Sequence, residues 1–295
     1  MTTTLSVRNL TQTFGETTAL DDISLALSTP GIHGLLGRNG SGKTTLMSIM
    51  AGLRKPTAGT VSLDGAPVYE NYAATTRICI IRESGDTTSE RTEAITDAFA
   101  LARDMRPFWD DAYAARLLEM FALTPEMKVC TLSRGERARL ACILGLASRA
   151  PLTLFDEAYL GMDAPARYAF YDALLADFLA HPRLILVSSH HIEEVARLFE
   201  EVMIIDSGRL VLHETAEALR GRGVSLTGPA VAVDALAVRA RLLSEKSLGP
   251  TKSVALYDAP PDLIDDARQA GIEIGTLPIQ DLFVHLTARP GKEIQ

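Results

Sequence analysis

The sequence contains few cysteines and few aromatic residues. Its 295 residues include only 3 cysteines and 1 tryptophan, and aromatic residues make up 6% of the chain. The cysteines, Cys79, Cys130 and Cys142, are odd in number and form no CxxC pair. This pattern argues against a disulfide framework and against a zinc site, and it is typical of a reduced cytosolic protein.

A basic surplus and a long hydrophobic run are also absent. Lys and Arg number 29 against 37 Asp and Glu, which gives a formal net charge of −8. This balance argues against nucleic acid as a partner, because neutralising phosphates requires a basic face. The most apolar stretch, 140–155, contains Arg149 and Pro151 and is shorter than the roughly 20 residues of a membrane-spanning helix. We therefore predict a chain without a membrane span, and its start lacks the pattern of a signal peptide.

The hydrophobic pattern alternates between strand-like and helix-like segments. Strands are predicted over 5–10, 23–27, 32–36, 60–63, 77–81, 152–155, 184–187 and 202–205, and helices over 43–53 and 164–180, with a turn at Asp21-Asp22. From about 88 to 147, apolar residues recur at spacings of three and four, which is typical of helices. This order predicts an α/β sheet with an inserted helical subdomain.

Glycine and proline predict a boundary late in the chain. Gly221-Arg222-Gly223 and Gly228-Pro229 indicate a linker, because both residue types punctuate regular structure. Beyond it the alternation is weaker, with strands expected near 254–256 and 272–274. We therefore predict a main domain over 1–215, with its helical subdomain at about 84–147, and a small α+β domain over 216–295.

A glycine-rich segment follows the strand predicted at 32–36 and opens the next helix. It matches GxxxxGK[ST] and consists of Gly37, Arg38, Asn39, Gly40, Ser41, Gly42, Lys43, Thr44 and Thr45. Glycines allow backbone N–H groups to approach phosphate oxygens, and the helix N-terminus adds its positive dipole end. Lys43 supplies a positive charge to the β- and γ-phosphates, and Thr44 offers a hydroxyl to Mg²⁺. The segment predicts a nucleotide-phosphate site.

Two carboxylates follow the apolar strand predicted at 152–155. Asp156 is suited to holding Mg²⁺, directly or through water, and Glu157 to polarising the water that attacks a γ-phosphate. Such a pair can also be a solvated strand end. A phosphate loop about 110 residues upstream favours the catalytic interpretation.

Three further motifs narrow the choice among families of phosphate-loop proteins. Leu132-Ser133-Arg134-Gly135-Glu136 precedes the acidic pair, Gly161-Met162-Asp163 follows it, and Ser188-Ser189-His190 ends the next apolar strand. In this order and spacing, residues 3–213 resemble the nucleotide-binding domain of ABC transporters. The resemblance implies an α/β P-loop NTPase core (an ABC ATPase) with an inserted helical subdomain and a small C-terminal α+β extension.

The resemblance also implies roles for single positions. The segment 132–136 is similar to the LSGGQ signature, which closes over the ATP held by a partner subunit; it departs at Arg134, which can face phosphate or remain solvated, and at Glu136. His190 resembles the switch histidine at the γ-phosphate, and Asp163 resembles the D-loop aspartate between the two sites of a dimer. Phe14 occupies the place of the aromatic ring that stacks on adenine.

One departure falls at the Q-loop. Arg82 and Glu83 stand where the family usually has Pro-Gln. Glu83 can still ligate Mg²⁺ through oxygen, at the cost of extra negative charge near the γ-phosphate, or it merely lines the loop. A second departure is Ala158, where the family often has proline after the catalytic glutamate.

The function implied by the resemblance is ATP hydrolysis coupled to transport. It implies ATP and Mg²⁺ as cofactors and a head-to-tail dimer with a second copy or a paralogous ATPase. A separate multi-span membrane permease would hold the chain at the cytoplasmic face of the membrane and contact its helical subdomain, and export rests on the analogy alone. A soluble or regulatory ABC ATPase with low turnover, not coupled to transport, is the alternative. The C-terminal segment is interpreted as a packing or dimer-support domain rather than a ligand sensor.

Overall fold

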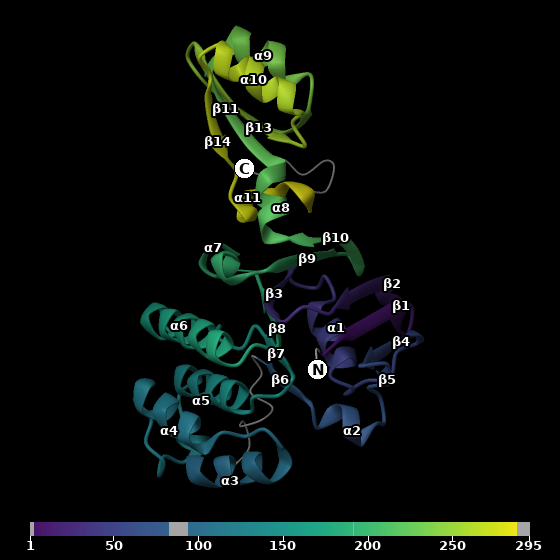
Figure 1. The fold of residues 1–295 in the computed structure, drawn as a ribbon, viewed down its shortest axis with the longest axis vertical. Coiled ribbons are helices and arrows are strands. Elements are labelled where there is room, and N and C mark those ends of the chain that lie inside the picture. Colours follow the sequence, from purple (N-terminus) through teal and green to yellow (C-terminus); the bar gives the residue numbers. More distant parts are fainter. Residues whose placement is uncertain (1–2, 83–93, 191, 288–295) are drawn as a thin grey trace. The chain divides into compact units, whose positions relative to one another are not determined.

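The computed structural model describes residues 3–82, 94–190 and 192–287. The chain divides into two compact units. The first comprises Met1–His190 and Leu198–His213, and the second comprises His191–Arg197 and Glu214–Gln295. Figure 1 shows the chain with its helices and strands labelled. Each unit is described by itself below.

The first unit is built on a six-stranded sheet with strand order β10-β9-β3-β8-β7-β6. Its strands are β3 (Gly31–Leu36), β6 (Ile78–Arg82), β7 (Leu152–Asp156), β8 (Leu184–Ser189), β9 (Glu201–Asp206) and β10 (Arg209–Thr215). The strands from β6 to β9 pair in parallel. Every residue of β3, β7 and β8 is buried, as expected for parallel strands covered on both faces. The strands predicted within these ranges are confirmed.

A second, antiparallel sheet has the order β2-β1-β4-β5. It contains β1 (Leu5–Phe14), β2 (Thr17–Leu27), β4 (Ala58–Leu63) and β5 (Ala66–Pro67). The turn predicted at Asp21-Asp22 is wrong, because β2 runs through these residues. Asp22 takes a left-handed φ of 51° beside register shifts in the β1–β2 pairing, so the strand absorbs the two aspartates as an irregularity. The chain reverses instead at Gly15-Glu16, between the two strands.

Helices cover the six-stranded sheet on both faces. On one side lies α1 (Lys43–Met50), which contacts β7 and the antiparallel sheet, and on the other lie α5 (Arg134–Ala147) and α6 (Ala164–Ala180) (Figure 1). The helix predicted at 43–53 therefore ends earlier, and the one predicted at 164–180 is confirmed. The remaining helical elements of this region are α2 (Tyr72–Thr75), α3 (Ile95–Met105), α4 (Asp111–Met120) and the short η1 (Val129–Thr131).

Four helices of this unit begin at side-chain caps, and the first of them is α2, capped by Asn71. Asp110 accepts a hydrogen bond from the Tyr113 N–H at the start of α4, Ser133 caps α5, and Asp163 caps α6. Such caps satisfy N–H groups that have no partner within the helix. They fix where α5 and α6 begin, and both starts carry motifs that the sequence singles out.

The second unit contains a four-stranded antiparallel sheet with the order β12-β13-β11-β14. Its elements are α7 (Ile192–Val195), α8 (Ala216–Arg222), β11 (Gly223–Pro229), α9 (Ala230–Ala237), β12 (Arg241–Leu248), β13 (Thr251–Tyr257), α10 (Pro261–Gln269), β14 (Glu273–Thr276) and α11 (Ile279–Leu286). The short η2 (Ala196–Leu198) spans the boundary in the sequence at which the first unit resumes. Side chains of α9 and α10 pack with Leu226, Val254 and Leu256 of the sheet into one core.

The linker predicted in this region is wrong. Gly221 and Arg222 end the helix α8, and the run from Gly223 to Pro229 is the strand β11. The side chains of Leu282 and Leu277 pack so closely that a Cβ on Gly223 would lie 2.7 and 2.9 Å from them. The glycine therefore allows close packing instead of marking a flexible joint.

Two features of the described residues concern membrane-spanning helices and disulfide bonds. None of the helices in the described part of the chain is both long enough and apolar enough to cross a membrane. Cys79, Cys130 and Cys142 are all free thiols.

Candidate nucleotide-binding site

The phosphate loop lies between the end of β3 and the start of α1. Gly40 and Gly42 have positive φ angles of 78° and 107°. A Cβ on Gly42 would lie 2.8 Å from the Ala19 carbonyl oxygen, so both conformation and space require glycine there. No side chain caps α1 at Gly42. The N–H groups of its first turn are therefore suited to receive an anion.

The ammonium group of Lys43 is buried within this loop. Its Nζ donates hydrogen bonds to the carbonyl oxygens of Gly37 at 2.8 Å and Arg38 at 3.3 Å. It also lies 3.2 Å from Oε1 of Glu157. Loop carbonyls and a carboxylate thus hold the cation at the place where phosphate charge is expected.

Asp156 ends β7 and is 4% exposed. The Ser188 hydroxyl donates a 2.8 Å hydrogen bond to its Oδ1, and the Thr44 hydroxyl bonds to the same carboxylate. Burial raises the pKa of Asp156, although both hydroxyls and Lys43 act in the opposite direction. A desolvated carboxylate of this kind is stabilised by a cation.

The donor set around Asp156 fits Mg²⁺. A carboxylate and the Thr44 hydroxyl are the hard oxygen ligands that this ion prefers. No group of three or more His, Cys, Asp or Glu able to hold a metal occurs among the described residues. Mg²⁺ characteristically binds through one or two protein oxygens and takes its other ligands from phosphates and water. Glu83, the further predicted ligand, lies outside the described residues.

Glu157 adopts an unusual backbone conformation. Its φ is 51°, in the left-handed region that costs a non-glycine residue energy and often marks a functional site. Its N–H donates to Oγ of Ser188 at 3.1 Å, and its Oε1 lies 3.2 Å from Nδ1 of His190. The same Oε1 contacts Lys43. The carboxylate is therefore held between an ammonium group and an imidazole.

Ser188 joins the two acidic residues, and sequence reasoning assigned it no role. Its hydroxyl donates to Asp156 and accepts from the backbone of Glu157. Parallel pairing of β7 with β8 places Asp156 opposite Ser188. The signal was present in the Ser188-Ser189-His190 motif, but the cross-strand register was needed to interpret it.

The signature segment forms the start of α5. The Ser133 Oγ accepts from the Glu136 N–H at 3.3 Å, and Oε2 of Glu136 accepts from the Ser133 N–H at 2.8 Å. This is a reciprocal capping box. These hydrogen bonds from Ser133 lower the pKa of Glu136. Glutamate and glutamine both complete such a box, so Glu136 keeps this local role although it departs from the family pattern.

The D-loop packs directly against the signature segment. A Cβ on Gly161 would lie 2.9 Å from the Arg134 carbonyl oxygen, so the two backbones approach closely. Asp163 accepts from the Ala166 N–H at 3.1 Å, and its carboxylate lies 3.6 Å from the guanidinium of Arg139 on α5. The predicted residues thus form two groups, one around the phosphate loop and one at the start of α5.

Two more positions were singled out from the sequence. Phe14 ends β1 and is 43% exposed, with the guanidinium of Arg54 lying 4.8 Å from its ring centroid. Arg82 ends β6, and its Nη2 donates to Oγ of Ser48 at 3.0 Å. Ser48 lies on α1, and its hydroxyl donates to the Thr44 carbonyl at 2.6 Å. The residue before the Q-loop position is therefore joined to the phosphate-loop helix.

The parallel sheet and the loop between β3 and α1 define a P-loop nucleotide-binding protein. The family model "ABC transporter" matches residues 20–160. A putative ABC transporter ATP-binding protein of Halobacterium salinarum is 33% identical, over 74% of this chain and 95% of the relative. A Nod factor export ATP-binding protein I of Ralstonia nicotianae is 28% identical, over 97% of this chain and 94% of the relative.

Solved structures agree at the level of the fold. The ATP-binding subunit of an ABC transporter matches with a TM-score of 0.65 at 23% identity, over 74% of this chain and 92% of that chain. A dimeric ATP-binding cassette bound to ADP and Pi matches with a TM-score of 0.63 at 22% identity, over 72% of this chain and 98% of that chain. The chain belongs to the ATP-binding proteins of the ABC transporter family, and it is an ABC ATPase.

Proposed function

We propose that this chain is the ATP-hydrolysing subunit of an exporter and that it acts with Mg²⁺ in a head-to-tail dimer. One observation carries the proposal. Oε1 of Glu157 lies 3.2 Å from both Lys43 Nζ and His190 Nδ1, on a strained backbone at the end of β7. A carboxylate fixed in this way is suited to accept a proton from an attacking water.

Each residue around the phosphate loop receives a role in this proposal. Loop N–H groups and Lys43 bind the phosphates of ATP, and Glu157 takes the proton as water attacks the γ-phosphorus. The bond between the γ-phosphorus and the β–γ bridging oxygen breaks, which releases ADP and phosphate. His190 orients Glu157 and the water. Mg²⁺, held by Asp156 and Thr44, neutralises phosphate charge when it is bound.

The second group of residues serves the partner's ATP. The N-terminus of α5 carries Ser133 and Gly135, and a helix N-terminus favours a phosphate. Asp163 lies beside this helix N-terminus because its carboxylate pairs with Arg139 of α5. A partner subunit bound at the signature segment is therefore expected to affect the D-loop as well. Dimeric cassettes among the similar structures support the pairing. On the rim of this proposed arrangement, Phe14 stacks on adenine.

A groove on the first unit is suited to receive a helix of the permease. It has a volume of about 590 Å³ and lies between the end of α1, the strand β6 and the helix α3. Tyr72 and Met105 in its lining are 83% and 66% exposed, and large exposed apolar groups are typical of interaction sites. Relatives named for Nod factor export and for doxorubicin resistance support export as the direction. The permease would hold the chain at the cytoplasmic face of the membrane.

The catalytic assignment is tested with Glu157→Gln. Because this change keeps the shape and removes the base, we expect ATP hydrolysis to fall about 100-fold or more. ATP binding should persist, and the ATP-bound dimer should accumulate in size-exclusion chromatography. Glu119→Gln, an exposed change on α4, is the matched control. Unaltered hydrolysis by Glu157→Gln would remove the assignment of the base.

The permease contact is tested separately. Met105→Asp in the groove should abolish co-purification with a co-expressed candidate permease, while ATP hydrolysis by the isolated chain is retained. Turnover of the wild-type chain that is low, and that no permease changes, would instead favour the regulatory alternative.

A further inference from the structure

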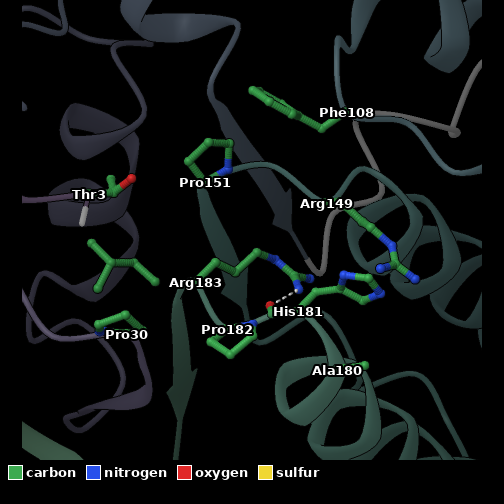
Figure 2. Close-up of a pocket in the computed structure, with 10 residues that line it drawn as sticks. Thr3, Pro30, Phe108, Arg149, Pro151, Ala180, His181, Pro182 and Arg183 are labelled. Atoms are coloured by element: carbon green, nitrogen blue, oxygen red, sulfur yellow. Dashed lines mark hydrogen bonds between the residues drawn. The ribbon is translucent and has the colours of Figure 1, made fainter. Parts of the chain in front are cut away.

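A second cavity lies at the N-terminal ends of the parallel strands, whereas the phosphate loop follows the C-terminal end of β3. It has a volume of about 570 Å³. Its walls come from the segments that lead into β3, β7 and β8, and Figure 2 shows these segments around it. Asp156 lies at the other end of β7, a five-residue strand. At about 3.3 Å per residue, the two sites are roughly 15 Å or more apart. The cavity is therefore separate from the nucleotide site.

The polar side chains that line this cavity are basic or neutral. The polar lining residues are Thr3, Arg149, His181 and Arg183, and none of the described residues that line the cavity is acidic. In Figure 2 the Arg183 side chain extends along the cavity toward His181, whose carbonyl oxygen accepts from Arg183 Nη1 at 3.2 Å. An arrangement of guanidinium groups without an acidic lining residue favours an anionic ligand.

Both arginines are held from behind by carboxylates. Arg183 Nη2 donates to Asp177 Oδ2 at 2.7 Å, and Arg149 lies 3.5 Å from the other oxygen of Asp177 and 3.2 Å from Asp110. The Arg183 side chain is 7% exposed and that of Arg149 is 13% exposed. These ion pairs fix the two guanidinium groups in position without the help of a ligand.

Each of these arginines retains a donor without a partner. Within the described part of the chain, the buried Nε atoms of Arg149 and Arg183 have no hydrogen-bond acceptor. Burying a charged donor without an acceptor is unfavourable. Both Nε atoms are buried, so a ligand in the cavity contacts other parts of these guanidinium groups, whose planar geometry suits a carboxylate or phosphate oxygen. Arg149 also has a left-handed φ of 44°, which indicates local backbone strain.

The remaining walls are apolar. Phe108, Pro151 and Leu184 line the cavity together with Pro30 and Pro182, and the Phe108 ring is 45% exposed. An inorganic anion would leave these side chains uncovered, whereas an organic acid covers them. We infer that this cavity binds a small organic anion, a carboxylate or phosphate monoester whose apolar body packs on Phe108 and the prolines.

The chain carries its own reporter for this site. Its single tryptophan, Trp109, follows Phe108 and precedes Asp110, which contacts Arg149. Its ring packs against Phe99 at 5.5 Å, and its Nε1 donates to Asp111. The fluorescence of this one side chain should therefore change when a ligand enters the cavity.

The test titrates the full chain with benzoate, phenyl phosphate and the neutral benzyl alcohol, with ADP and Mg²⁺ saturating the nucleotide site. We expect saturable fluorescence changes for both anions with a Kd of roughly 1–10 mM, typical of a small ligand, and at least about tenfold weaker binding of benzyl alcohol. Because phenyl phosphate also suits the phosphate loop, the titration is repeated without nucleotide, and a response seen only in the absence of ADP would overturn the inference.

Substitutions then locate the site. Arg183→Lys keeps the charge beside Asp177 but loses the planar fork, and should weaken binding of both anions about tenfold. Phe108→Ala alters an exposed wall residue and should weaken binding without unfolding the chain. Arg116→Met, an exposed change on α4 outside the lining, is the control. Equal affinities in Phe108→Ala, Arg183→Lys and the wild type, or no saturation by either anion, would overturn the inference.

Discussion

The change Ser188→Ala tests how the two acidic residues at the end of β7 are held. It removes the donor to Asp156 and the acceptor of the Glu157 N–H. Hydrogen bonds to charged groups contribute about 1.5–3 kcal/mol, and a buried group left unsatisfied costs about 1–3 kcal/mol. We therefore expect the first unit to lose roughly 2–4 kcal/mol of unfolding free energy near neutral pH.

The pH dependence of that loss follows from the direction of the Asp156 pKa. Burial already raises this pKa, and the Ser188 hydroxyl opposes the shift, so the substitution raises the pKa further. The lost stabilisation belongs to the ionised carboxylate. It is therefore largest above the folded-state pKa of the variant and shrinks as the pH falls and Asp156 becomes protonated.

The assay is urea unfolding of the wild type, Ser188→Ala and Ser28→Ala, followed by Trp109 fluorescence. Trp109 lies in the first unit, which matters because chains of more than one unit need not unfold in a single step. Ser28 is exposed and serves as the control. A loss that keeps the same size from about pH 7.5 down to the lowest pH at which the wild type stays folded would refute the electrostatic reasoning.

Three further predictions concern other parts of the site. Glu136→Ala should destabilise the chain by about 0.5–2 kcal/mol at neutral pH by removing the capping box, whereas Glu136→Gln should retain most of it. Because the folded-state pKa of Glu136 is lowered, the charged-state part of this stabilisation should disappear as pH falls through that pKa, and thermal melting across pH checks both points. Gly161→Ala places a Cβ 2.9 Å from a signature-segment carbonyl and should cost roughly 1–3 kcal/mol, while Gly221→Ala, with open space around it, should melt like the wild type. Phe14→Ala should raise KM for ATP roughly 5- to 100-fold with kcat nearly unchanged if the ring stacks on adenine, and an unaltered KM would exclude stacking.

Local patterns made much of the nucleotide site predictable. The glycines before Lys43 and the acids after an apolar strand lie within short segments, so the sequence displays them directly. The prediction failed where a residue type has two structural uses. Asp21-Asp22 is typical of a turn, yet the long β1–β2 ladder tolerates left-handed residues at both Asn9 and Asp22. Gly223 is typical of a linker, yet in the structure it begins β11 and lets two leucine side chains pack closely against that strand.

Contacts between distant segments could not be predicted in this way. The Ser188 hydroxyl reaches Asp156 only because β7 and β8 pair in a particular register. Arg82 meets Ser48, 34 residues earlier, because β6 ends beside α1. Neither distance nor register is encoded by composition or spacing, so these side chains had no assigned role before the fold was known.

The helix α1 has a consequence for how the protein responds to its surroundings. Its start carries Lys43 and Thr44, and Ala51 and Leu53, which follow its last turn, line the apolar groove. The hydrogen bond from Arg82 to Ser48 joins the end of β6 to the second half of α1. Eight residues make a rod of about 12 Å, too short to bend appreciably. A helix bound in the groove can therefore change the affinity for nucleotide by some factor. Thermodynamic reciprocity then requires that bound nucleotide changes the affinity for that helix by the same factor.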